Sequence, residues 1–187
     1  APGVAPADSG GAATSAPPTA APAVVHGDFD AVDALPRRVP VPSLRPPIGA
    51  CLPTGVELAG ARVVVMLDEG GVGEALVKLL TKAGATPLTL DPGVATDALL
   101  TALTDWEAEA PIDGVYWLPA LDGDGDLGDY DLGQWREALR RRVKALYAAM
   151  RHLYDSSPFL VAATRLGGYH GYDADGATNP LGGPVVG

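Results

Sequence analysis

Two carboxylates and three glycines follow one apolar run, and this stretch offers the clearest chemistry in the sequence. Residues 62–67 are almost purely aliphatic and β-branched, which predicts a strand buried on both faces of a parallel sheet. Gly70, Gly71 and Gly73 come next, and residues 74–82 have the apolar side of a helix. A glycine turn between strand and helix is typical of a dinucleotide site, where main-chain N–H groups and the helix N-terminus receive a pyrophosphate.

The same turn holds Asp68 and Glu69. Two carboxylates would repel a pyrophosphate, whereas an acidic residue at a helix start stabilises the helix itself. The turn therefore has two interpretations, a nucleotide site that uses Gly70, Gly71 and Gly73 or a purely structural connection. We favour the structural one.

Asp91 also has two interpretations. It follows the second predicted strand, residues 86–90, where an acid in a nucleotide-binding fold accepts hydrogen bonds from the ribose hydroxyls. The following Pro92 and Gly93 indicate instead that Asp91 begins a turn, and we favour the turn. We therefore predict no firm cofactor-binding residue in this chain.

The acidic run DGDGDLGDYD, residues 122–131, begins like a calcium-binding EF-hand loop. However, Leu127 stands where that loop needs glycine and Gly133 where it needs a bidentate carboxylate. We expect an acidic, solvated loop and no metal site.

Composition excludes several classes of partner. The net charge is −10, which argues against nucleic acid or an anionic membrane surface. The chain has neither an apolar run of membrane-spanning length nor a secretory signal, so we expect a cytoplasmic protein.

Cys51 is the one cysteine in the sequence. A single cysteine excludes an internal disulfide, and we expect Cys51 to be a small buried hydrophobic residue. A first residue other than methionine suggests a piece of a longer polypeptide.

Strand and helix patterns alternate along the chain. Strands are predicted at 62–67, 86–90, 112–118 and 159–164, and helices at 74–82, 94–109 and 131–154. This alternation predicts an α/β fold, a Rossmann-like doubly wound parallel sheet. Asn179 and Pro180 begin a further helix shortly before the sequence stops, so we expect the sheet to be truncated at its C-terminal end.

The last long helix has a predicted cap and a predicted core face. Asp131 and Gln134 have the spacing of a capping box. The positions expected to be buried are Trp135, Leu139, Val143, Leu146, Met150 and Leu153. Arg140 and Arg141 belong to the opposite, basic side, which we expect to be solvated rather than bound to an acidic partner.

The chain before this domain has a different composition. Residues 1–23 are almost entirely Ala, Pro, Gly, Ser and Thr, which predicts a disordered linker. Residues 24–57 remain proline-rich but contain scattered aliphatic side chains, so we expect an extended arm that lies against the domain. Residues 58–187 form the Rossmann-like domain.

Three segments, MLDEGGVG (66–73), IDGVYWLPALD (112–122) and FLVAATRLGG (159–168) with the later NPLGGPVVG (179–187), carry a family resemblance. The chain resembles the short-chain dehydrogenase/reductase fold and, more narrowly, the N-terminal structural subdomain of ketoreductases in type I polyketide synthases and polyunsaturated fatty acid synthases. In that family a C-terminal catalytic half binds NADPH. The resemblance implies that the complete domain reduces a 3-ketoacyl group on an acyl carrier domain, and that the partners of this chain are the catalytic half and the carrier domains.

This sequence departs from the family's catalytic pattern. The family's fingerprint T-G-G-x-G-G-x-G is matched only at its end, since Met66, Leu67 and Asp68 replace the threonine and the first two glycines. Thr164 could stand in for the family's catalytic serine only together with a correctly spaced tyrosine and a nearby lysine. Tyr169 and Tyr172 are the candidate acids, but the residues four positions later are not lysine, and no lysine follows Lys144.

We therefore identify no catalytic residue and expect a non-catalytic scaffold. Two alternatives stay open. The first is a stand-alone NAD(P)-binding reductase that uses Asp91 and the three glycines, with Tyr169 or Tyr172 as the acid. The second is a module that docks carrier domains through Arg140 and Arg141.

Overall fold

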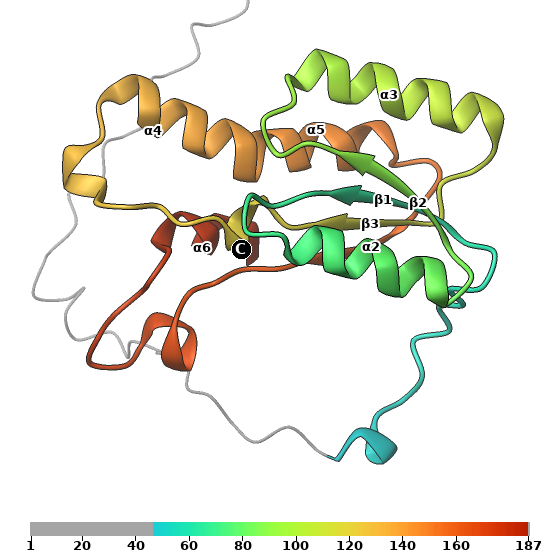
Figure 1. The fold of residues 1–187 in the computed structure, drawn as a ribbon, viewed down its shortest axis with the longest axis horizontal. Coiled ribbons are helices and arrows are strands. Elements are labelled where there is room, and N and C mark those ends of the chain that lie inside the picture. The colour runs from blue at the N-terminus through green and yellow to red at the C-terminus, as the bar shows by residue number, and fades with distance from the viewer. Residues whose placement is uncertain (1–46, 187) are drawn as a thin grey trace, which may run out of the picture. The chain divides into compact units, whose positions relative to one another are not determined.

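Four parallel strands form one sheet in the computed structural model, which describes residues 47–186 (Figure 1). The central strand β1 (Arg62–Met66) lies between β2 (Thr86–Leu90) and β3 (Gly114–Trp117), and β4 (Phe159–Ala162) lies outside β3. The chain places β2 on one side of β1 and then places β3 and β4 on the other side, in the order β2-β1-β3-β4. This change of direction is the topology of a doubly wound sheet. The predicted α/β, Rossmann-like fold is confirmed.

Helices cover the two faces of the sheet unequally. Helices α3 (Thr96–Glu109) and α5 (Ala145–His152) lie on one face, and α2 (Val72–Lys82) lies on the other (Figure 1). The alternating side chains of β1 serve both layers, because Val64 and Met66 pack toward α3 and α5 while Val63 and Val65 pack toward α2. All four are buried, as expected for the central strand of a parallel sheet.

Arg62 joins the start of β1 to the end of α3. Its guanidinium donates to the main-chain carbonyl oxygens of Trp106, at 2.8 Å, and Ala110, and pairs with the Glu109 carboxylate. The last carbonyls of a helix have no partner within the helix. Arg62 therefore satisfies the C-terminus of α3 and fixes that helix against the sheet.

The predicted elements are in place, but several of their ends differ. Strand β2 has the predicted bounds, whereas β3 lacks Ile112 and Leu118 of the predicted strand and β4 ends at Ala162. Ile112 and Leu118 are buried outside the ladder, so an apolar run marks burial rather than strand pairing. Helix α2 begins at Val72, before the predicted start.

The long helical segment after residue 131 is not one α-helix. The predicted capping box is confirmed, with Asp131 accepting from the Gln134 N–H and the Gln134 side chain accepting from the Asp131 N–H. However, α4 (Leu132–Leu139) is followed by a π-helical segment, η4 (Arg140–Lys144), before α5. The wider turn rotates α4 relative to α5. Trp135, which we expected to be buried, is 39% exposed.

The described part of the N-terminal arm also differs from expectation. The predicted linker and the arm up to residue 46 lie outside the described residues. Residues 47–57 are all exposed, including Cys51, so the prediction of a buried cysteine is wrong. No helix within residues 47–186 is long and apolar enough to cross a membrane.

Gly114 provides a test of the β3–β4 pairing. It pairs with Phe159 of β4, and a Cβ at Gly114 would overlap the Phe159 ring, which also packs edge-to-face on Tyr116. We expect Gly114→Ala to lower the free energy of unfolding by about 1–3 kcal/mol through overpacking, measured by urea denaturation. Gly93→Ala, whose Cβ would meet no atom within 4 Å, is the matched control. Equal stability of the two variants would contradict this pairing.

Candidate functional site

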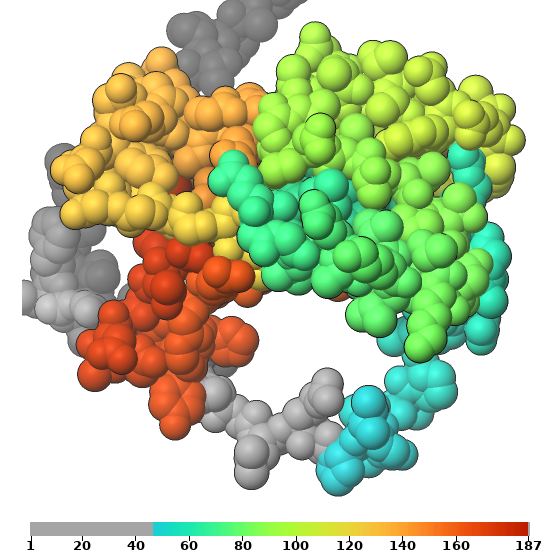
Figure 2. Space-filling model, in the orientation of Figure 1, coloured from blue at the N-terminus to red at the C-terminus, as the bar shows by residue number. Residues whose placement is uncertain are grey.

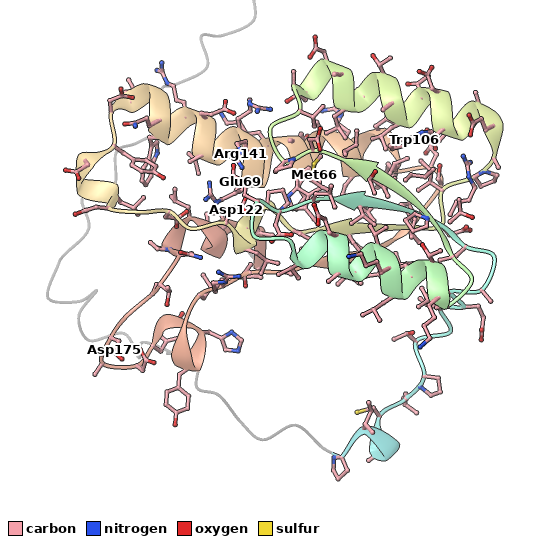
Figure 3. All side chains as sticks on the ribbon, in the orientation of Figure 1. Met66, Glu69, Trp106, Asp122, Arg141 and Asp175 are labelled. Carbon is pink, nitrogen blue, oxygen red and sulfur yellow. The ribbon has the colours of Figure 1, made fainter. Side chains whose placement is uncertain are left out.

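The crevice where ligands bind in doubly wound sheets lies at the carboxyl ends of the strands on either side of the reversal point. In this chain those strands are β1 and β3, and the crevice is bordered by residues 67–71 and 118–131. A cavity of about 370 Å³ opens there, and its lining includes Glu69, Asp122 and Arg141. Figure 3 shows these three side chains together at the end of the sheet.

Asp68 receives the main-chain N–H groups at the start of α2. Its Oδ1 atom accepts from the Gly73 N–H at 2.6 Å, and its Oδ2 atom accepts from the Val72 N–H at 3.2 Å. The side chain is buried, with Asp68 only 7% exposed. These are the donors that would face a phosphate in a nucleotide-binding turn. A carboxylate of the chain itself therefore occupies the anion position at this helix N-terminus.

The glycines of the turn have structural explanations. Gly71 has φ of +83°, which glycine adopts without strain. A Cβ at Gly73 would lie 2.7 Å from Leu67 Cδ2 and 3.2 Å from Asp68 Oδ1. The glycines thus permit the tight turn and the close approach of Asp68 to the helix.

Asp122 connects the loop after β3 to the loop after β1. Its Oδ1 atom accepts from the Glu69 N–H at 2.7 Å, and its Oδ2 atom lies 3.1 Å from a guanidinium nitrogen of Arg141. The same nitrogen lies 2.7 Å from Glu69 Oε1. Burial raises the pKa of Asp122, and the nearby Glu69 and Asp68 charges add to this rise, while the Glu69 N–H and Arg141 oppose it.

A second buried ion pair lies beneath the first. Asp124 Oδ1 is 2.7 Å from a guanidinium nitrogen of Arg142, with side-chain exposures of 0% and 4%. Asp124 Oδ2 accepts from the Leu181 N–H at 2.9 Å, and Asn179 Oδ1 accepts from the Asp124 N–H at 3.4 Å. Asp124 therefore anchors the segment that leads into η6 (Pro180–Gly182) and α6 (Gly183–Val186). Figure 2 shows the red C-terminal residues directly against the yellow loop after β3.

These contacts correct the prediction of a solvated acidic loop. Asp122 and Asp124 are buried, and each is paired with an arginine. Asp126 is exposed and caps the short helix η3 (Leu127–Asp129) by accepting from the Gly128 N–H. No group of three potential metal ligands lies together among residues 47–186.

The π-helical turn brings neighbouring arginines to these partners. Arg141 also donates to the Pro92 carbonyl, and Arg142 donates to the Asp122 carbonyl. The Trp117 indole N–H donates to the main-chain oxygen of Arg142 at 2.9 Å, which ties the turn to β3. Three consecutive arginines in one helix point in different directions, so they cannot all lie on one solvent-facing side. This run of arginines was the sequence signal that the prediction of a basic face did not take into account.

The prediction that Arg140 and Arg141 form a solvated face is accordingly wrong. Arg140 donates to the Val94 carbonyl at 2.9 Å and to both carboxylate oxygens of Glu137. Its hydrogen bond lowers the pKa of Glu137. The side chains of Arg140 and Arg141 are 26% and 20% exposed, so both arginines are engaged within the chain.

The side chains of the remaining candidates take no part in this network. Asp91 is exposed, and its carbonyl accepts from the Val94 N–H in a turn at the end of β2. Tyr169 and Tyr172 are 65% and 56% exposed and lie in the segment after β4. Thr164 lines a different cavity from the one at the crevice.

The chain has the doubly wound, Rossmann-like fold. No family model matches it, and no curated protein matches it. Among solved structures it is similar to a protein described as a short chain dehydrogenase/reductase family protein, with 18% identity and a TM-score of 0.44 over 70% of this chain. The match spans 65% of that protein. The fold assignment rests on the sheet order and not on this likeness.

Removal of the Asp68 carboxylate tests its role as a cap. We expect Asp68→Ala to lower the free energy of unfolding by about 0.5–2 kcal/mol, the usual cost of losing an N-terminal cap. Asp91→Ala, which removes an exposed carboxylate, should stay within about 0.5 kcal/mol. Urea denaturation measures both, and an equal effect of the two changes would contradict the cap.

The raised pKa of Asp122 gives a pH-dependent prediction. A carboxyl whose folded pKa exceeds its unfolded value of about 3.9 contributes less stability as pH rises through the interval between the two values. Asp122→Asn lacks this titration. Its stability relative to the wild-type chain should therefore rise across that interval, by about 1.4 kcal/mol for each pH unit that separates the folded from the unfolded pKa. Denaturation at a series of pH values measures the difference, and a falling difference would contradict the rise in pKa.

Proposed function

We propose that this chain is the non-catalytic scaffold half of a β-ketoacyl reductase domain in a multidomain polyketide or fatty acid synthase. In this proposal, a C-terminal catalytic half binds NADPH and reduces a 3-ketoacyl thioester on a carrier domain to the 3-hydroxyacyl thioester. The scaffold half supports that catalytic half and binds no cofactor itself. Its setting is cytoplasmic, and its partners are the catalytic half and the acyl carrier domains.

The position of the Asp68 carboxylate carries the proposal. The pyrophosphate of a nicotinamide dinucleotide would need the N–H groups of Val72 and Gly73, which already donate to Asp68. A phosphate at this place would also meet Glu69 and Asp122 across the crevice, and like charges at close range repel. The residues present do not fit the cofactor.

The segment after β4 supports a non-catalytic role as well. A tyrosine that donates a proton to a carbonyl needs a nearby cation to lower its pKa. The residues four positions after Tyr169 and Tyr172 are Asp173 and Gly176, and the last lysine is Lys144. This pattern gives neither tyrosine the partner that the reductase reaction requires.

The alternative functions gain no support from the contacts. A stand-alone reductase would use Asp91 for the ribose, but Asp91 lies in an exposed turn. A carrier-docking module would use Arg140 and Arg141, and both are bonded to groups of this chain.

Cofactor titration tests the proposal. We expect the isolated chain to give no saturable change in NADPH fluorescence up to about 1 mM, the upper end of usual Michaelis constants, and no reductase activity toward a 3-ketoacyl thioester. A stand-alone reductase of the same fold provides the positive control. Saturable NADPH binding by the wild-type chain that Asp91→Ala abolishes would overturn the scaffold proposal and favour the stand-alone reductase.

A further inference from the structure

A cavity of about 620 Å³ lies beyond the carboxyl end of β4. Its walls come from the segment after β4, which includes η5 (Gly168–Gly171), and from η6 and α6. It shares no lining residue with the cavity at the crevice between β1 and β3. Its volume is in the range of small-molecule sites, about 300–1,000 Å³.

The lining of this cavity is apolar and contains no acidic residue, lysine or arginine. Leu166, Ala177, Pro180 and Val186 provide the apolar surface, and Thr164, His170 and Tyr172 provide the groups that can form hydrogen bonds. The cavity at the crevice is instead lined by acidic and basic side chains. A charged ligand would lose hydration here, and no carboxylate, lysine or arginine of the lining would offset that cost, so the lining favours an uncharged ligand.

The walls are held in place before any ligand arrives. The Thr178 N–H donates to the Leu166 carbonyl at 3.1 Å. Gly171, with φ of +83°, packs so closely on Ala177 that a Cβ at Gly171 would lie 2.9 Å from it. Asp124 accepts from the Leu181 N–H and so holds η6, which contributes Pro180 to the wall. A pre-formed cavity loses little conformational entropy on binding.

The backbone beside the cavity is strained. Tyr169 and His170 have φ of +45° and +57°, a left-handed conformation that non-glycine residues rarely adopt. Such strain persists where the surroundings enforce it, and it is concentrated at binding and active sites. In this chain the strained pair ends at His170, which lines the cavity.

We infer that the cavity beyond β4 binds an uncharged aliphatic ligand, an alkyl or acyl chain with one hydrogen-bonding group, which Thr164, His170 and Tyr172 recognise at the polar part of the wall. This inference does not depend on the proposed function. It requires neither a cofactor nor a catalytic half.

Calorimetric titration of the full chain with 1-decanol and with decanoate tests the inference. We expect saturable one-site binding of 1-decanol and at least tenfold weaker binding of decanoate, because only the second carries a charge. Absence of saturable decanol binding, or equally tight binding of decanoate, would overturn it.

Two matched glycine variants locate the site. Gly183 lines the cavity, and a Cβ there would meet no atom within 4 Å, so Gly183→Phe should fill the space and weaken decanol binding at least tenfold. Gly93 is equally unhindered and lies outside the lining, so Gly93→Phe should bind as the wild-type chain does. Unchanged binding by Gly183→Phe would overturn the location.

A second cavity variant covers the case in which Gly183→Phe does not fold, as judged by circular dichroism. Val186 also lines the cavity and is 62% exposed, so Val186→Trp should obstruct the cavity without burying a larger side chain in the core. Decanol binding by this folded variant at wild-type strength would overturn the inference.

Discussion

The contact between the Asp68 carboxylate and the N-terminus of α2 determines the character of this domain. A helix N-terminus presents unpaired N–H groups and a partial positive charge, and it needs an anion or another acceptor. Asp68 provides that acceptor from the end of β1, the strand that precedes the helix. The turn between β1 and α2 therefore supplies, from its own residues, the negative charge that this helix N-terminus needs. The close approach of Gly73 and the left-handed conformation of Gly71 follow from the same contact.

The charged side chains at the crevice are likewise paired with other groups of this chain. Their charged groups come from three separate segments, namely the loop after β1, the loop after β3 and the π-helical turn. A hydrogen bond from the Leu181 N–H to Asp124 adds the residues before α6. Buried charges are costly unless they are paired and hydrogen-bonded. A pair such as Asp124 and Arg142 therefore disfavours any arrangement in which one of these segments moves away. The place where related sheets receive ligands is thus bordered by contacts that hold this domain together.

The sequence allowed the strands, their order of appearance and the capping box at Asp131 to be predicted, because these depend on local apolar runs and on residues three positions apart. It did not reveal the burial of Asp122 and Asp124, since each partner arginine is about twenty positions away along the chain. The exposure of Trp135 was missed for a related reason. A period of 3.6 residues assumes an unbroken α-helix, and η4 breaks it. At the crevice, the repulsive chemistry of Asp68 was apparent, but the two hydrogen bonds that explain its presence were not.

The two outer strands present different edges to their surroundings. The Thr86 N–H donates to the Ala61 carbonyl of the neighbouring strand segment. The main-chain nitrogen of the next residue, Pro87, therefore faces away from β1, and as a proline it carries no N–H group on this outer edge. On β4 the Phe159 and Ala163 N–H groups donate to the segment of β3. This leaves the Leu160 and Ala162 N–H groups facing outward, without a main-chain acceptor among residues 47–186. For the sheet formed by residues 47–186, the addition of a further strand is therefore chemically asymmetric, because that strand would meet a missing N–H donor beside β2 and two outward N–H donors beside β4.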